Sequence, residues 1–162
     1  MKVVVTGGTG LIGRGIMEVF TQEHPDWEVT AVSRKPFQDG AKFPWKKLDI
    51  ADYDAAYETI TKLNPDVVIH TAAMALPDDC AKDPEGAWRS NFLGTRNVAL
   101  ACARFDTDLV YFSTDQAFYG APEKVHEEYD EPKGNSVYSH TKILGEVYVR
   151  EHLQKWWIVR TG

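Results

Sequence analysis

Cysteines, long apolar runs and clusters of basic residues are scarce in this sequence. Cys80 and Cys102 lack a CxxC pairing and nearby histidine ligands, so we expect reduced thiols and neither a disulfide nor a metal site. No apolar run reaches the roughly 18 residues that a membrane-spanning helix needs, and no signal peptide is recognisable, which together predict a cytoplasmic protein. The formal net charge is −6 and no run of lysine or arginine exceeds two, which argues against nucleic acid or an anionic membrane as a partner.

Apolar residues, in contrast, make up 43% of the 162 residues, enough for one good core and one domain over residues 1–162. The chain opens with MKVVVTGGTGLIG, an apolar run that changes abruptly into glycines. Residues 3–5 are all valine, which predicts a strand buried on both faces of a parallel sheet. The glycines fit GxGxxG from Gly8 and GxxGxxG from Gly7, both ending at Gly13.

In such a turn, glycine permits the sharp bend, lets a pyrophosphate approach the backbone, and allows the following helix to pack closely on the strand. Free amides at the helix start then bind the anion. A glycine-rich turn without a ligand is the alternative, whereas a Walker phosphate loop would need Lys-Ser/Thr where Arg14-Gly15 stand. We predict a dinucleotide site formed here by Gly7, Gly10, Leu11, Ile12 and Gly13.

Short apolar segments alternate with amphipathic ones along the rest of the chain. This alternation predicts a Rossmann-like α/β fold, a doubly wound parallel sheet in three layers with strand order 3-2-1-4-5-6 and helices on both faces. Ligands of such sheets bind at the carboxyl ends of the strands, beside the first strand. Further strands are expected at residues 28–32, 45–48, 67–70, 109–113 and 156–160, and helices after the glycine turn, from Asp52, over 83–104 and over 137–152.

The second strand ends in Ser33-Arg34-Lys35, about 20 residues after the last glycine, where an acidic residue would bind the ribose 2′-hydroxyl of NAD. No acidic residue is present there. A hydroxyl followed by two cations suits a 2′-phosphate, so we predict that Ser33 and Arg34 favour NADP(H) over NAD(H). Ordinary surface charges on a turn would produce the same pattern.

Two more strand ends are predicted to contribute to the cofactor site. Asp49 and Ile50 follow the third strand, where the Asp49 carboxylate would accept from the adenine amino group or cap the next helix. The fourth strand is followed by Thr71, Ala72 and Ala73, whose small side chains leave room for a ribose.

Tyr138 and Lys142 are spaced i and i+4 and therefore share one face of the predicted helix. A cation one turn away would stabilise the phenolate and lower the pKa of the tyrosine toward neutrality, as an acid–base role requires. A surface pair without function is the alternative. Tyr129 and Lys133 have the same spacing, but Pro132 excludes a helix there.

Other polar residues are candidates for the same site. The hydroxyl of Thr114, at the end of the fifth strand, would donate to a carbonyl oxygen or merely cap the strand end. Asn91, in the middle of a helix, either faces solvent or orders a water or a catalytic backbone group. Residues 116–137 lack a sustained period, and we expect a mobile flap over a substrate. Together these residues predict hydride transfer between a nicotinamide and a carbonyl or alcohol carbon.

These segments resemble the extended short-chain dehydrogenases/reductases, the NAD-dependent epimerase/dehydratase superfamily, and within them the dTDP-4-dehydrorhamnose reductases. The resemblance covers nearly the whole chain, in the right order. It departs at Ser139, where glycine is usual, and at Ala117, where valine is usual. The matching segments are TGGTGLIG, DVVIHTAA at 66–73, NFLGT at 91–95, VYFSTDQAF at 110–118 and VYSHTKILGE at 137–146.

The resemblance implies catalytic roles for Thr114, Tyr138 and Lys142, a supporting role for Asn91, and contacts from Tyr138 and Lys142 to a reduced nicotinamide cofactor. It implies a nucleotide-sugar substrate, a 4-keto-6-deoxyhexose carried on dTDP. Such enzymes continue past the sixth strand into a substrate-binding lobe, so we expect this chain to be the cofactor domain of a longer protein and to turn over little by itself. The oligomeric state stays open, a homodimer being one arrangement.

Two other functions fit the same motifs. A nucleotide-sugar epimerase or dehydratase would retain NAD and expects an acidic residue where Ser33-Arg34 stand. A non-catalytic NADP-binding regulator, resembling the β subunit of methionine adenosyltransferase, shares the STD and YxxxK segments. These motifs therefore do not separate a reductase from a regulatory subunit.

Overall fold

Six parallel strands form one sheet in the order β3-β2-β1-β4-β5-β6, which confirms the predicted topology. This computed structural model describes residues 1–38, 40–121 and 125–162. Every predicted strand is present to within one residue at each end. The strands are β1 (Lys2–Thr6), β2 (Glu28–Ser33), β3 (Trp45–Lys47), β4 (Val67–His70), β5 (Asp108–Thr114) and β6 (Trp156–Thr161).

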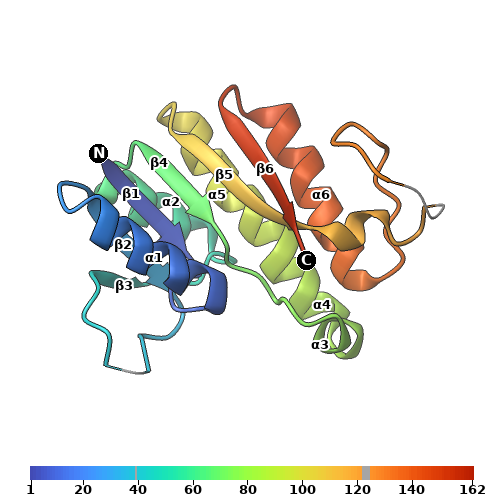
Figure 1. Cartoon of the computed structure of the whole chain (residues 1–162), viewed down its shortest axis with the longest axis horizontal. Coiled ribbons are helices and arrows are strands. Elements are labelled where there is room, and N and C mark those ends of the chain that lie inside the picture. Colours follow the sequence, from blue (N-terminus) through green and yellow to red (C-terminus); the bar gives the residue numbers. More distant parts are fainter. Residues whose placement is uncertain (39, 122–124) are drawn as a thin grey trace.

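Helices cover both faces of the sheet, as Figure 1 shows. The valines of β1 alternate between two cores: Val3 and Val5 pack with Met17 of α1 (Leu11–Glu23), whereas Val4 packs on the opposite face. That second core is larger and contains residues of α2 (Tyr53–Leu63), α5 (Gly94–Arg104) and α6 (Val137–His152). A strand with valines on both sides is therefore buried on both faces, as parallel sheets require.

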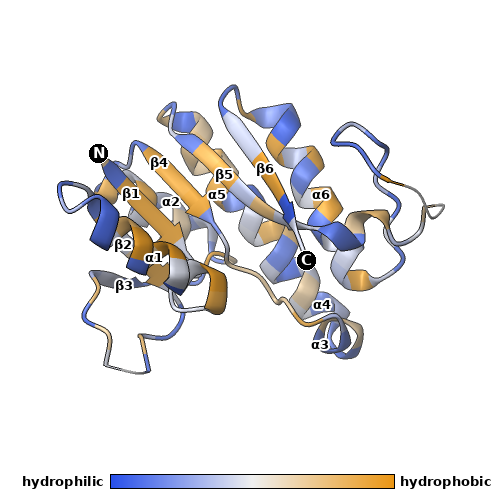
Figure 2. Ribbon diagram, in the orientation of Figure 1, coloured by the Kyte–Doolittle hydropathy of each residue, from blue (hydrophilic) through white to orange (hydrophobic). Residues whose placement is uncertain are grey.

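Hydrophobic residues run along the middle strands in Figure 2. On the α1 side, the packing becomes thinner toward β6, where 52% of the surface of Trp157 and 37% of that of Val159 is exposed.

Across the residues that the structure describes, no helix is long and apolar enough to cross a membrane. Cys80 and Cys102 are both free and buried.

The helix predicted over residues 83–104 is divided into three pieces, which the apolar spacing did not reveal. It begins as α4 (Pro84–Ala87), widens into the π-helical turn η1 (Trp88–Leu93) and continues as α5. A further helix, α3 (Pro77–Lys82), precedes it and was not predicted. π turns inside helices are rare and frequently mark functional sites. The position of Asn91 within η1 therefore favours a functional role for this residue.

Candidate functional site

The glycine turn between β1 and α1 is shaped by contacts that exclude side chains. Gly7 has a φ of +68°, and its N–H donates to Val32 O at 2.8 Å while its carbonyl accepts from Gly10 N at 2.8 Å. A Cβ on Gly7 would lie 2.7 Å from the backbone of Ala72, and one on Gly13 would collide with the carbonyl oxygen of Gly7. Both positions therefore require glycine.

The first turn of α1 is free of protein caps. Gly10 is the N-cap residue, and in the described structure no side chain caps the helix and no acidic residue occupies its first turn. The amides of residues 11–13 thus remain available, at the positive end of the helix dipole. Such a terminus is suited to a phosphate group.

We expect replacement of Gly13 by alanine to disrupt this turn, with Gly15→Ala as the matched control in the same helix. The new Cβ at Gly13 collides with a backbone oxygen, so we expect a loss of about 1–3 kcal/mol in the free energy of unfolding and a loss of dinucleotide binding. A Cβ on Gly15 would meet no atom within 4 Å, so Gly15→Ala should be neutral or stabilise by about 0.5–1 kcal/mol. Urea unfolding and dinucleotide titration measure both effects, and equal behaviour of the two variants would contradict this account.

A cavity of ≈ 470 Å³ lies beside this turn, at the carboxyl ends of the strands. Its volume is within the range of small-molecule sites. Lys35, the second cation of the predicted phosphate-binding turn, also lines it, as do Thr9, Val32, Leu48, Ala75 and Ser90, whose positions the sequence did not single out as ligand contacts. All the predicted cofactor residues outside α6 line the cavity: Gly7, residues 10–13, Ser33, Arg34, Asp49, Ile50 and residues 71–73.

The hydroxyl of Ser33 is used within the protein. It donates to Lys35 O at 2.6 Å and accepts from Trp45 Nε1 at 2.7 Å. Because a hydroxyl has one proton, Ser33 shapes the turn that carries the two cations and has no second proton for a phosphate. The selectivity predicted for this turn would therefore come from Arg34 and Lys35, which both line the cavity.

Asp49 does not cap α2. Its Oδ1 accepts from Ala51 N at 3.0 Å, and Asp52 is the N-cap, accepting from Ala55 N at 3.0 Å. The capping alternative for Asp49 is therefore wrong, because Asp52 lies at the helix start and Asp49 belongs to the preceding turn. Asp49 lines the cavity, and its contact with adenine stays a prediction.

Tyr138 lies at the start of α6, next to the end of β5. Ser136 and Ser139 form a reciprocal capping box there, so the serine that replaces the usual glycine stabilises the helix start. The Thr114 hydroxyl, which acts on the pKa of the nearby Tyr138 phenol, donates to Asp115 Oδ1 at 3.3 Å and caps the following 3₁₀ turn η2 (Asp115–Phe118) by accepting from Gln116 N at 3.2 Å. The capping alternative for Thr114 is thus present, and its donation to a carbonyl oxygen stays a prediction.

The pKa of Tyr138 is raised above its usual value, mainly because burial disfavours the phenolate, while the nearby Thr114 hydroxyl acts in the opposite direction. The expectation that Lys142 lowers it is wrong for this arrangement. The Lys142 ammonium donates to Phe112 O at 2.7 Å and lies 4.2 Å from the centre of the Tyr111 ring. Burial lowers the pKa of Lys142 itself to about 7, with Glu146 opposing the shift.

Asn91 is fully buried, so the solvent-facing alternative is wrong. Its Oδ1 accepts from Met74 N at 2.7 Å, and its Nδ2 donates to Met74 O at 3.1 Å and to Thr141 Oγ1 at 3.1 Å. The amide therefore fixes the backbone that follows β4 and ties it to α6. This is the ordering of a backbone segment that the sequence offered as the second possibility.

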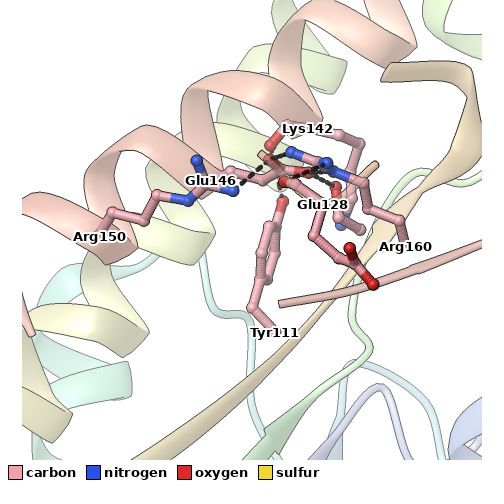
Figure 3. Close-up of polar contacts among 7 residues, drawn as sticks. Tyr111, Glu128, Lys142, Glu146, Arg150 and Arg160 are labelled. Carbon is pink, nitrogen blue, oxygen red and sulfur yellow. Dashed lines mark hydrogen bonds and ion pairs between the residues drawn. The ribbon is translucent and has the colours of Figure 1, made fainter. Parts of the chain in front are cut away.

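A buried carboxylate that the sequence did not single out lies one turn beyond Lys142 (Figure 3). Only 1% of the Glu146 side chain is exposed. Ser113 Oγ donates to it at 2.6 Å, Arg160 binds both of its oxygens at 2.9 and 2.6 Å, and Arg150 Nη2 lies 3.6 Å away. Arg160 also donates to Glu128 O at 3.2 Å. Arg150 has the i, i+4 spacing of an ordinary surface pair, whereas Arg160 and Ser113, which lie 14 and 33 positions from Glu146, bind it only through the fold, so no signal of burial was present in the sequence here.

The segment over residues 116–137 contacts Arg160 in a second way. The Arg160 guanidinium lies 4.7 Å from the centre of the Phe118 ring, which stacks on His126 at 4.4 Å. A second cavity, of ≈ 630 Å³, is lined by these three residues and by Asp115, next to Thr114. The predicted flap includes residues 122–124, which lie outside the described residues, so its mobility stays a prediction.

The competing Tyr129–Lys133 pair lies in this segment. Tyr129 is outside any helix and 82% exposed, which agrees with the exclusion of a helix by Pro132.

Among the described residues, no group of three or more His, Cys, Asp or Glu could hold a metal ion.

Comparison with known proteins identifies the chain's relatives. The family model described as RmlD substrate binding domain matches residues 1–162. The chain is 30% identical over 151 residues to methionine adenosyltransferase 2 subunit beta of Bos taurus, covering 93% of this chain and 43% of that protein. It is also 30% identical over 163 residues to dTDP-4-dehydrorhamnose reductase of Mycolicibacterium smegmatis, covering 99% and 45%.

Solved structures agree with this. A dTDP-4-dehydrorhamnose reductase of Clostridium acetobutylicum matches with a TM-score of 0.85 and 30% identity, over 100% of this chain and 53% of its own. The enzyme of that name from Bacillus anthracis, in complex with NADP, gives 0.80 and 27%, over 98% and 52%. UDP-glucose 4-epimerase of Thermus thermophilus, in complex with NAD, gives 0.84 and 29%, over 99% and 54%. The chain thus spans about half the length of the relatives that it matches.

Proposed function

The chain belongs to the RmlD substrate binding domain family of short-chain dehydrogenases/reductases, and on that basis we propose that it is the dinucleotide-binding half of a reductase. The reaction is reduction by NAD(P)H of the ketone of a nucleotide-linked 4-keto-6-deoxy sugar. One observation carries the proposal: Thr114, at the end of β5, lies close enough to the Tyr138 phenol on α6 to act on its pKa, at the carboxyl edge of the sheet where the ≈ 470 Å³ cavity also lies.

The cavity fits a nicotinamide dinucleotide. The glycine turn has no room for a Cβ at Gly7 or Gly13, and the uncapped start of α1 supplies amides for a pyrophosphate. Ala72 and Ala73 leave space beside the turn, and Arg34 carries a positive charge at the other end. When bound, the reduced nicotinamide would supply a hydride. Tyr138 and Lys142 are proposed to contact its nicotinamide end from α6.

The side chains at the edge of the sheet would supply the proton that the carbonyl oxygen gains during the reduction. Tyr138 keeps its proton at neutral pH because burial raises its pKa, so it can donate to a carbonyl oxygen that is gaining negative charge. The nearby Thr114 hydroxyl is proposed to orient that phenol. The pKa of Lys142, about 7, lies near the working pH, as proton exchange requires. Asn91 holds the backbone of Met74, which lies between the cavity-lining residues Ala73 and Ala75.

The substrate side of the proposal rests on the ≈ 630 Å³ cavity next to Thr114, which brings Asp115 and Arg160 to the same edge. Because the chain spans about half the length of its relatives, we propose that residues outside it complete the substrate site. The exposed Trp157 and Val159 on β6 offer an apolar surface for such a part.

A titration of this chain with NADPH and NADH tests the dinucleotide site. Binding is monitored by energy transfer from the five tryptophans of the chain to the reduced nicotinamide. We expect saturable binding that favours NADPH. In Arg34→Ala the affinity for NADPH should fall about tenfold and that for NADH should change little, because a charge-assisted bond to the 2′-phosphate is lost. Lys47→Ala is the matched control, since Lys47 pairs with Ser33 in the sheet but does not line the cavity. Equal binding of both dinucleotides would contradict the NADP preference.

A regulatory subunit is the second candidate, favoured by the 30% identity to methionine adenosyltransferase 2 subunit beta. It would bind the dinucleotide without turnover. Oxidation of NADPH that depends on a nucleotide-linked keto sugar would exclude it, whereas a change in a partner enzyme's activity on adding this chain would support it. The epimerase or dehydratase alternative is weakened because Ser33 and Arg34 occupy the position where NAD-retaining enzymes carry an acid.

A further inference from the structure

His70, the last residue of β4, has no exposed surface and two hydrogen-bonded ring nitrogens. Its Nδ1 lies 2.6 Å from Thr6 Oγ1, and its Nε2 lies 2.9 Å from Thr95 Oγ1. The proposed reaction does not use this residue. Its partners come from two different layers of the fold, the end of β1 and the start of α5.

The direction of each hydrogen bond follows from counting protons. Thr95 Oγ1 donates its single proton to Asn91 O at 2.6 Å, so toward His70 it can only accept, and His70 Nε2 must carry a hydrogen. In a neutral ring, Nδ1 is then an acceptor, and the Thr6 hydroxyl donates to it. The Thr6 oxygen in turn accepts from Ala72 N at 3.4 Å.

These hydrogen bonds form a series in which every group donates in the same direction, from the Ala72 amide through Thr6, His70 and Thr95 to the carbonyl of Asn91. Its first members belong to the cavity edge: Ala72 lines the cavity, and Thr6 directly precedes Gly7. At the far end, Asn91 fixes the Met74 backbone and contacts Thr141 of α6. This series of hydrogen bonds therefore joins the dinucleotide cavity to the helix that bears Tyr138.

Neighbouring groups keep the ring neutral. Burial lowers the pKa of His70 to about 3, and the Lys142 charge acts in the same direction. The His70 ring stacks on Tyr111 at 5.6 Å, and Lys142 lies over that same tyrosine. In a protonated ring both nitrogens would donate, and the Thr6 hydroxyl would have to turn its proton away from Nδ1 in order to accept.

We propose that His70 is a positioning residue, which as the neutral Nε2–H tautomer aligns the π-helical turn that carries Asn91 with the cavity edge at Thr6 and Ala72. Its role in turnover rests on the proposed function, whereas its tautomer and its effect on Asn91 do not. A core histidine that is merely satisfied would fill the same space without transmitting any change to Asn91. The difference is measurable at Met74, whose amide donates to Asn91 Oδ1.

The first experiment records long-range ¹H–¹⁵N correlations of the His70 ring in the labelled, full chain between about pH 5 and 8.5. We expect one Nε2–H tautomer that does not titrate. An Nδ1–H tautomer, or protonation within this range, would overturn the proposal. This measurement needs no variant and no turnover.

The second experiment compares Thr95→Val with Thr95→Ser, which keeps the hydroxyl. In Thr95→Val we expect hydrogen-exchange protection of the Met74 amide to fall about tenfold, because His70 and the Asn91 carbonyl both lose their partner. In Thr95→Ser it should stay within about twofold of the unchanged protein. Equal protection of the Met74 amide in both variants would overturn the proposal.

A third measurement separates the positioning role of His70 from the proposed reductase function. Thr95 does not line the cavity, so Thr95→Val should bind NADPH nearly as well as the unchanged protein while kcat for the keto sugar falls about tenfold at constant KM. These kinetics are measured in the longer reductase that carries this chain; if that protein shows no turnover, the proposed function fails and the exchange data still decide the role of His70. A parallel loss of NADPH affinity and turnover would overturn the positioning role.

Discussion

Replacing Tyr138 by phenylalanine is expected to lower NADPH-dependent reduction of a nucleotide-linked keto sugar by about 10²–10⁴-fold, the usual contribution of a general acid. The phenol lies near Thr114 and is the proton donor proposed for the developing alkoxide. Because phenylalanine retains the ring, the start of α6 and the Ser136–Ser139 capping box should be unaffected. The measurement is kcat in the reductase that carries this chain, together with the NADPH dissociation constant.

Tyr129→Phe is the matched control, since Tyr129 precedes a lysine at the same spacing but is 82% exposed and outside any helix. It should leave kcat and NADPH binding unchanged. Turnover by Tyr138→Phe at more than about a tenth of the original rate would show that another group delivers the proton. Undiminished turnover would remove Tyr138 from the mechanism altogether.

Arg160→Leu should have the largest effect on stability, a loss of about 3–5 kcal/mol in the free energy of unfolding, because it leaves the Glu146 carboxylate buried without its bidentate partner. Only 1% of Glu146 and 12% of Arg160 is exposed, and Arg150 reaches the carboxylate only at 3.6 Å. Urea unfolding followed by tryptophan fluorescence gives the value. Adding Glu146→Gln to Arg160→Leu should recover part of it, because the uncompensated charge is removed while Ser113 keeps an acceptor.

Lys62→Leu provides the control on a surface ion pair. Lys62 and Glu58 bond at 2.8 Å but are 70% and 65% exposed, so the change should stay within about 0.5 kcal/mol. A loss for Arg160→Leu as small as that for Lys62→Leu would mean that water reaches Glu146 once the arginine is gone. The carboxylate would then be solvated in the variant, and the ion pair would contribute little to stability.

The sequence was sufficient for the strands, their order and the glycine turn because these depend on local rules. Runs such as Val3–Val5 show a two-sided strand by composition alone, and the glycine turn after the first strand indicates the 3-2-1-4-5-6 order of dinucleotide-binding sheets, whose crossovers are right-handed. The site residues at strand ends were predictable for the same reason, since parallel strands place all their carboxyl ends at one edge. Their lining of one cavity is what the structure adds.

Local patterns failed where a residue's environment is made by distant parts of the chain. Spacing placed Tyr138 and Lys142 on one helix, yet the Lys142 ammonium bonds to Phe112 O, and burial raises the pKa of Tyr138 instead of lowering it. The π turn around Asn91 was equally invisible, because its pattern of apolar residues resembles that of an ordinary helix.

By itself, then, the sequence determined the Rossmann-like sheet, the position of the glycine turn and the set of candidate residues, because periodicity and turn chemistry act between near neighbours. Only the tertiary structure decided how the buried polar groups are paired. Thr6 and His70 are 64 positions apart and His70 and Thr95 are 25 apart, and burial, which sets the pKa of His70 and Lys142, exists only once those segments pack together.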